Sequence, residues 1–440
     1  MNIIILHSHD TGRFIEPYGC SVPTPNLMAL AREGTVFRQA HSAAPTCSPS
    51  RAAMLSGMAP HSIGMLGLVH RGFQMNDHSK HLASYLSRCG YETVLSGVQH
   101  EAASPELLGY DRILRLDSKP RSHKESDWIH AQLAADYIRS RNSRKQKPFF
   151  LFYGMFLPHR PFLQASEPEA AGYVSLPSTL ADTPENREDM ARYIASAAWM
   201  DRCAGEVLNA VREAGLEDET VIIYTTDHGI AFPGMKCTLN DAGTGVSLIV
   251  AFPGNALAGK VSDALVSHID LFPTLCDLGG LDKPDWLQGR SLMPILRRQT
   301  GEVNTSVYAE VNYHAAYEPM RSIRTKQYKL IRYYDDYAKP ILVNIDDSPP
   351  KEWLIKHGFA DQEREKVRLH DLYIDPMEQV NVADHPRYAA IKQELSDALE
   401  CWMKKTSDPL LHGLAKKPIG AMVNRKDSIS VRENRYETDE

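Results

Sequence analysis

The residues with the clearest chemical potential are a cysteine and an arginine in the segment 47-CSPSRAAMLSG-57. Cys47 stands in a Ser/Pro-rich stretch that suits the first turn of a helix, and Arg51 follows one turn later on the same face. A helix N-terminus favours an anion, and a guanidinium can pair with an oxyanion. Two interpretations follow: Cys47 is a low-pKa nucleophile, or it is the precursor of a modified residue.

Two aspartates with histidine neighbours follow apolar runs, in 6-LHSHDTGR-13 and in 225-TTDHGIAFPGMK-236. An aspartate at a strand end is often only a helix cap or a turn former. In one parallel sheet, however, both tips would converge on the same edge. They would then supply the carboxylates and imidazoles that a divalent cation needs. The pair therefore indicates a metal site more strongly than either tip does alone.

The elements that must position these tips alternate along the chain. Short β-branched or aromatic runs are separated by helix-length amphipathic segments. The predicted strands are 2–7, 91–97, 148–156, 220–227 and 246–253, and the clearest helices between them are 80–90 and 187–215. This alternation predicts an α/β fold, in which a large, mostly parallel sheet is covered by helices on both faces.

The pattern changes after about residue 315. Residues 320–334 form two alternating segments around a turn, and a helical pattern occupies 387–405. We therefore predict a catalytic domain at 1–315, a smaller α+β domain with an antiparallel sheet at 316–412, and a polar C-terminal arm or tail at 413–440.

The composition is that of an ordinary globular protein, with 43% hydrophobic and 24% charged residues among 440 and a net charge of −6. This charge offers no basic field for nucleic acid or for an anionic membrane. Seven scattered cysteines without a CxxC pair argue against a disulfide scaffold and against a zinc knuckle. No signal peptide precedes 2-NIIIL-6, which is too short to span a bilayer, so we expect a cytoplasmic protein.

The order of motifs resembles the sulfatase family. The segment 47-CSPSR-51 matches its C-x-P-x-R signature, and the other matching motifs are 157-LPHRPF-162, 226-TDHG-229, 270-DLFPTL-275 and 374-IDPMEQVN-381. In that family the cysteine is oxidised to formylglycine, whose hydrated aldehyde is a geminal diol. The resemblance implies an alkaline phosphatase-like fold, metal-dependent hydrolysis of sulfate esters or sulfamates, and a formylglycine-generating or sulfatase-maturing enzyme as a partner.

The resemblance also implies a set of site residues. The catalytic residues would be Cys47 as the nucleophile precursor, Arg51 holding the diol and the sulfate, His100, His159 as the acid for the leaving group, and Lys236 on a sulfate oxygen. The metal ligands would be His9, Asp10, the modified Cys47, Asp227 and His228. Taken singly, His100, His159 and Lys236 are more often structural or solvated, and only their order in the motif favours the functional interpretation.

Two positions depart from the family pattern. His9 stands where many sulfatases have the first of two adjacent aspartates, so the metal site loses a negative charge and gains a potential nitrogen ligand. Val98 stands where the family usually has a lysine near the diol. We expect one divalent cation, Ca²⁺, with Mn²⁺ and Zn²⁺ as the alternatives that a nitrogen ligand favours.

Within the family, the segments CSPSRA, PHR at 158–160, PMRSIR at 319–324 and 402-WMKKTSDP-409 resemble the sulfamidases, the N-sulfoglucosamine sulfohydrolases. We expect an enzyme that removes sulfate from a sulfated sugar, with N-sulfated glucosamine as the first choice, as in glycosaminoglycan degradation. The alternatives are a phosphonate or phosphate ester hydrolase, an arylsulfatase, and a catalytically silent sulfatase-like binding protein, which His9 and Val98 suggest.

Overall fold

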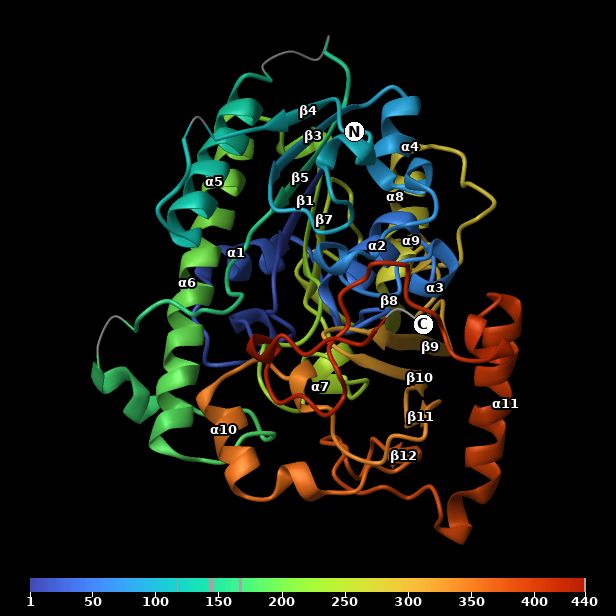
Figure 1. Ribbon diagram of the computed structural model, residues 1–440. Helices are drawn as coiled ribbons and strands as arrows, with labels where there is room; N and C mark the ends of the chain where they lie inside the picture. Colours follow the sequence, from blue (N-terminus) through green and yellow to red (C-terminus); the bar gives the residue numbers. More distant parts are fainter. Residues whose placement is uncertain (117, 142–145, 166–167, 439–440) are drawn as a thin grey trace.

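The centre of the molecule is an eight-stranded sheet, seen in a computed structural model that describes residues 1–116, 118–141, 146–165 and 168–438 (Figure 1). Its strand order is β4-β3-β5-β1-β6-β7-β2-β8. The strands are β1 (Asn2–Ser8), β2 (Thr35–His41), β3 (Glu92–Gly97), β4 (Arg112–Leu114), β5 (Phe149–Gly154), β6 (Thr220–Thr226), β7 (Leu248–Ala251) and β8 (Lys260–Ser267). Every pair is parallel except those of β7 with β6 and β2. The predicted α/β class is confirmed.

The central strand β1 is apolar on both faces because helices cover both faces of the sheet. Ile4 and Leu6 face a core with α1 (Pro25–Glu33), α5 (His123–Arg139) and α6 (Pro184–Glu213). Ile3 and Ile5 face the opposite core with α2 (Cys47–Ser56), α4 (Leu82–Arg88) and α8 (Leu271–Gly279). The two helix layers lie on opposite sides of the sheet in Figure 1. Continuous apolar runs are typical of such a doubly covered parallel strand.

A second, antiparallel sheet has the order β12-β11-β10-β9. Its strands are β9 (Ser306–Tyr313), β10 (Tyr317–Thr325), β11 (Tyr328–Tyr333) and β12 (Val367–Asp371), and α11 (Ala389–Lys405) lies beside them (Figure 1). Leu395 and Leu399 of α11 share a core with Ile323 and Leu330 of the sheet. The remaining short helices are α3 (Pro60–Ile63), α7 (Asp241–Thr244), α9 (Met293–Leu296) and α10 (Pro349–Lys356).

The second sheet begins earlier than the predicted boundary between residues 315 and 316. Strand β9 starts at Ser306, so that boundary falls between β9 and β10 of the same hairpin. Five consecutive residues of β9 are buried, because the strand also contacts the large domain, where the N–H groups of Glu310 and Tyr313 donate to the carbonyls of Ala43 and Leu66. Burial on both faces removes the alternation that would mark β9 in the sequence.

The polar C-terminal segment is an arm, as far as residue 438, where the described part ends. Val423 and Asn424 are buried, and the backbone N–H groups of Met422 and Asn424 donate to the carbonyls of Arg71 and Ala315. These contacts hold the arm against the rest of the molecule.

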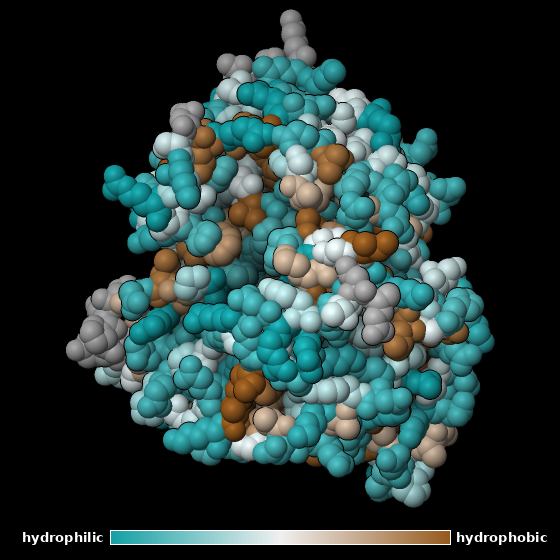
Figure 2. Space-filling model, in the orientation of Figure 1, coloured by the Kyte–Doolittle hydropathy of each residue, from teal (hydrophilic) through white to brown (hydrophobic). Residues whose placement is uncertain are grey.

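The face of the described chain in Figure 2 is mostly polar, as expected for a protein with the composition of an ordinary globular chain. Its hydrophobic residues lie in small separate groups. Among the described residues, none of the helices combines the length and the apolar character that crossing a bilayer requires. All seven cysteines are free thiols.

Candidate active site

The carboxyl ends of β1 and β6 bring the two Asp-His tips together. These strands pair in parallel register up to Ser8 and Thr226, so His9–Asp10 and Asp227–His228 emerge side by side. The backbone N–H of Asp10 donates to Asp227 Oδ1 over 2.8 Å. Asp10 adopts a left-handed backbone with φ of 45°, which is uncommon for a residue other than glycine. The hydrogen bond and this turn hold two fully buried carboxylates next to each other.

Helix α2 carries Cys47 to the same place. Cys47 is the first residue of the helix, as predicted, and its side chain is buried. The Ser50 hydroxyl, in the first turn, donates to the carbonyl of Asp227 over 2.6 Å and so ties the helix to the tip of β6. Cys47 Sγ consequently lies 3.4 Å from His228 Nε2.

Arg51 is a buried cation whose hydrogen-bonding capacity is unused. Its side chain is fully buried, and its Nε lies 3.5 Å from Asp227 Oδ2, too far for a good hydrogen bond. None of its three guanidinium nitrogens has a hydrogen-bond partner among the described residues. Leaving charged donors unsatisfied in a protein interior is costly, so this geometry indicates that an anionic ligand completes the site.

A lysine and an aspartate close another side of the cluster. Lys236 Nζ lies 3.0 Å from Asp10 Oδ2 and 3.2 Å from Asp346 Oδ2. Asp346 comes from the segment between β11 and α10, so the C-terminal part of the chain also contributes to the site. Sequence reasoning missed Asp346, because 345-IDDSPP-350 has no spacing that distinguishes it from a helix-capping turn.

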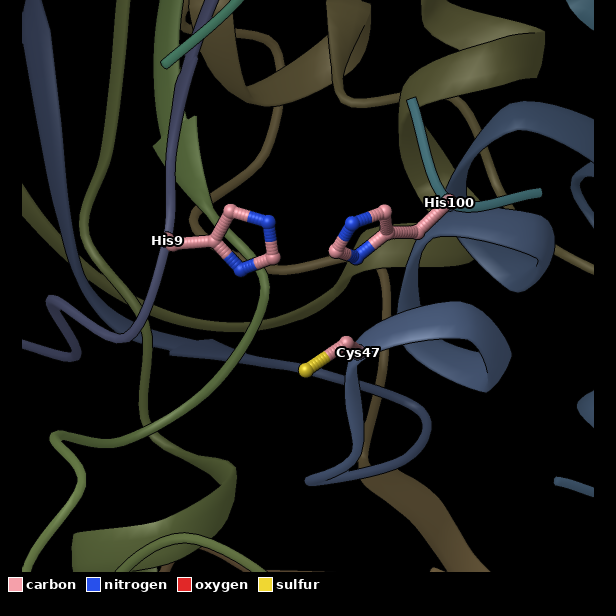
Figure 3. A group of neighbouring side chains, drawn as sticks. All are labelled: His9, Cys47 and His100. Atoms are coloured by element: carbon pink, nitrogen blue, oxygen red, sulfur yellow. The ribbon is translucent and has the colours of Figure 1, made fainter. Parts of the chain in front are cut away.

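Three histidines surround the carboxylates. The ring of His9 lies 4.7 Å from that of His100 and 5.3 Å from that of His159, measured between centroids. His159 Nε2 is 3.9 Å from Asp10 Oδ2, and its Nδ1 is 2.6 Å from the carbonyl oxygen of Arg160. Burial lowers the pKa of His159 to about 4, so this ring is neutral near pH 7 when no ligand is bound. Figure 3 shows His9 and His100 facing each other above Cys47.

The electrostatics of the cluster favour ionised side chains. Burial opposes the thiolate of Cys47, but the charges of Lys236 and His228 overcome it and lower the pKa of the thiol to about 7. Burial also opposes a charge on His228, yet Asp227 and Asp10 raise the pKa of this ring to about 9. In the same way, burial and Arg51 oppose a charge on His9, but Asp227 and Asp10 raise its pKa to about 10. Such perturbed groups gathered in one place are typical of a functional site.

The residues fit a divalent cation. One donor atom from each of His9, Asp10, Cys47 and Asp227 lies within 4.8 Å of the others. The buried atoms Asp10 Oδ1, Asp227 Oδ2 and His9 Nε2 have no hydrogen-bond partner among the described residues. Carboxylate oxygens and imidazole nitrogens are ordinary ligands of Ca²⁺, Mn²⁺ or Zn²⁺, so a cation there would satisfy atoms that the protein leaves unpaired.

The structure therefore brings together every residue that the sequence singled out, and the role of each one stays a prediction. The residues are His9, Asp10, Cys47, Arg51, His100, His159, Asp227, His228 and Lys236. Besides Asp346, the structure adds the buried Glu101, whose carboxylate accepts a hydrogen bond from the backbone N–H of His100 over 2.9 Å.

Two family models match this sequence, one over most of the chain and one over a shorter segment. The family model described as sulfatase matches residues 2–281, and the model described as the C-terminal part of N-sulphoglucosamine sulphohydrolase matches residues 235–357. An ulvan-active sulfatase of Formosa agariphila is 29% identical over 435 residues, which cover 95% of this chain and 83% of the relative. Human N-sulphoglucosamine sulphohydrolase is 28% identical, over 93% of this chain and 91% of its own.

Solved structures show the same fold. A crystal structure of a putative sulfatase from Bacteroides thetaiotaomicron superposes with a TM-score of 0.74 at 22% identity, over 98% of this chain and 99% of that chain. A second structure, solved with its substrate D-glucosamine-2-N,6-O-disulfate, superposes with a TM-score of 0.71 at 20% identity, over 92% of this chain and 98% of that chain.

Proposed function

Because this chain belongs to the sulfatase family, we propose that it removes the sulfate from the nitrogen of an N-sulfated glucosamine, with formylglycine made from Cys47 as the nucleophile. One observation carries the choice of substrate. The family model for the C-terminal part of N-sulphoglucosamine sulphohydrolase matches residues 235–357, and this stretch supplies Lys236 and Asp346 to the cluster around Cys47. The human relative of that name, similar over most of both chains, supports the same choice.

The proposed reaction needs two groups that the chain must acquire. A divalent cation held by Asp10, Asp227, His228 and His9 would supply positive charge against the sulfate oxygens. A formylglycine at position 47, produced by a sulfatase-maturing enzyme, would supply a hydroxyl nucleophile and a second hydroxyl through which sulfate can later be released. A cysteine or serine has no second hydroxyl and cannot supply that release.

Arg51 and Lys236 bind the sulfate in this proposal. A sulfate carries negative charge that repels an anionic nucleophile, so the site must neutralise the oxygens that do not take part in bond cleavage. The unpaired guanidinium nitrogens of Arg51 offer several charge-assisted hydrogen bonds in a buried setting. The Lys236 ammonium, already between Asp10 and Asp346, adds a second cation.

His159 protonates the leaving nitrogen, and Asp346 helps to orient the sugar. In the absence of ligand, burial keeps the pKa of His159 at about 4. An anionic substrate beside the ring favours its charged form and raises that pKa, so that a proton is present when the S–N bond breaks. Asp346 faces the same cluster from the C-terminal part of the chain and can accept hydrogen bonds from sugar hydroxyl or amine groups.

A second candidate substrate is a sugar that carries its sulfate on oxygen. The observation that favours it is the name of the relative that is 29% identical, an ulvan-active sulfatase. The site residues serve both reactions, since S–O and S–N cleavage need the same nucleophile and an acid for the leaving group.

The test is sulfate release by metal-loaded protein that has been made together with a maturing enzyme. The panel contains N-sulfoglucosamine, glucosamine 6-O-sulfate, an aryl sulfate and the phosphate ester matched to it. We expect the highest kcat/KM for N-sulfoglucosamine and no sulfate release by the Cys47→Ala variant. A higher kcat/KM for the O-sulfated sugar would select the second candidate. Preference for the phosphate ester, or no release from any sugar, would contradict the proposal.

A further inference from the structure

We propose that the protein carrying an unmodified Cys47 thiol binds a soft divalent cation, Zn²⁺ being the clearest case, between His9, Cys47 and His100. This site goes beyond the proposed function, because it belongs to the thiol form of the protein and disappears when the sulfur is replaced. It shares His9 and Cys47 with the cation site described above, but it uses His100 in place of the carboxylates.

The donor atoms of the three side chains lie close together. One ring nitrogen of each histidine and the sulfur all lie within 4.8 Å of one another. Figure 3 shows the two imidazoles facing each other, with nitrogens on the facing edges and the Cys47 side chain below them. Zinc bonds to nitrogen and sulfur place ligand atoms roughly 3.3–3.8 Å apart in a tetrahedron, so closing the site requires side-chain movements of about 1 Å.

Asp227 orients His9 for this role. His9 Nδ1 lies 2.9 Å from Asp227 Oδ2 in an ion pair, and both ring nitrogens of His9 are buried without a well-aligned hydrogen bond among the described residues. A histidine that ligates a metal usually donates its other ring N–H to a carboxylate, which fixes the tautomer and the ring orientation. The 2.9 Å ion pair of His9 and Asp227 has the spacing for this arrangement, and Figure 3 shows a ring nitrogen of His9 on the edge that faces His100.

The donor set selects the metal. A thiolate and two imidazoles are ligands that zinc prefers, whereas calcium takes six to eight oxygens. Arg51 and Lys236 add positive charge nearby, and the buried carboxylates of Asp10 and Asp227 offset it. Binding displaces two protons to solvent, one from the Cys47 thiol and one from the imidazolium of His9, whose other ring N–H stays beside Asp227. Since formylglycine has no sulfur, maturation removes this site, and zinc held in the immature protein makes Cys47 unreactive.

The first experiment uses Co²⁺ as a spectroscopic substitute for zinc, added to metal-free protein made without a maturing enzyme. We expect one equivalent to produce a thiolate-to-cobalt charge-transfer absorption and the visible bands of a four-coordinate ion. The Cys47→Ala variant should lose the charge-transfer absorption. The His100→Gln variant should weaken cobalt binding by roughly 10–100-fold or more. His159→Gln is the matched control, because His159 also contacts His9 but lies outside the donor set.

The second experiment measures alkylation of Cys47 by iodoacetamide, read by peptide mass spectrometry, with the exposed Cys89 as an internal control. Zinc should protect Cys47 at least tenfold and leave Cys89 unaffected, and calcium should protect neither. Cobalt binding without a charge-transfer absorption, equal binding by His100→Gln, or no cobalt binding would overturn the proposal. None of these results depends on whether the mature protein hydrolyses a sulfated sugar, so the two proposals fail independently.

Discussion

At the scale of single residues, the site is a balance of buried charges. Asp10 and Asp227 face Lys236, Arg51 and the imidazolium groups of His9 and His228, and none of these side chains is exposed to solvent by more than a few per cent. Because little solvent screens these charges, the loss of one side chain changes the others strongly. Predictions at this scale therefore concern charge and hydrogen-bonding geometry.

Replacing Arg51 by lysine keeps the positive charge but removes the planar fork of donors. We expect kcat for the sulfated sugar to fall by about 10²–10³-fold, because several hydrogen bonds to the developing charge are lost. The measurement is steady-state kinetics of the matured variant, with circular dichroism to check the fold. Arg38→Lys is the matched control, since Arg38 pairs with Asp263 at the surface. Unchanged kcat in Arg51→Lys would exclude Arg51 from transition-state binding.

The Cys47 thiol should titrate near neutrality in the metal-free, unmodified protein. With a pKa of about 7, the thiolate fraction rises as the pH increases, and the rate of alkylation should increase about tenfold between pH 6 and pH 8. Lys236 stabilises the thiolate, so Lys236→Met should move the midpoint to higher pH. Lys236→Arg should restore it. Peptide mass spectrometry at several pH values measures the rate, and identical midpoints in all three proteins would refute the role of Lys236.

At the scale of helices and strands, the central strands of the large sheet are easier to predict from the sequence than the strands near its edge. Strands form at the ranges predicted as 2–7, 91–97, 148–156, 220–227 and 246–253, because most of their residues are buried between the two helix layers and each range holds a short run of apolar residues. The sequence does not reveal strands β2 and β8. Arg38 interrupts β2, and the first four residues of β8 are not buried, because β8 lies at the edge of the sheet.

The loop that carries His100 depends on a close approach of two backbones. Gly97 ends β3 with φ of +81°, and a side chain there would clash with the carbonyl oxygen of Gly154 at the end of β5. Gly97→Ala should therefore unfold at lower urea concentration and also reduce kcat, because His100 is displaced.

Gly90→Ala is the control for Gly97→Ala, because it introduces the same backbone strain without a steric clash. Gly90 has φ of +90°, but no atom lies within 4 Å of the position that a Cβ would occupy, so its substitution should cost only about 1–2 kcal/mol in the free energy of unfolding. We expect the cost at Gly97 to exceed that at Gly90 by at least about 1 kcal/mol. Equal losses in the free energy of unfolding for the two variants would show that the close contact between Gly97 and Gly154 does not matter for stability.

At the scale of the whole molecule, the site joins parts of the chain that are distant in sequence. Asp10, Cys47 and Asp227 come from the large domain, whereas Asp346 comes from the C-terminal part. The order of motifs predicts the first three. Asp346 could not be predicted, because only the packing of the second sheet and its following loops brings it to Lys236. The same packing conceals β9, whose residues are buried on both faces.

A cation bound at this junction should stabilise the entire fold. A ligand that binds only the folded protein adds about 2.7 kcal/mol to the free energy of unfolding when its concentration is 100 times Kd. We expect EDTA to lower Tm and a divalent cation to restore it. Asp227→Ala should abolish this metal-dependent shift, and Asp263→Asn, at the exposed pair with Arg38, should preserve it. The same shift in both variants would exclude Asp227 as a ligand.

The proposed chemistry depends most directly on the identity of residue 47. Peptide mass spectrometry over 44-APTCSPSR-51 should be carried out on protein made together with a sulfatase-maturing enzyme whose activity is verified on a second sulfatase. We expect the mass of formylglycine at position 47. An intact thiol at that position, despite an active maturing enzyme, would contradict the proposed chemistry.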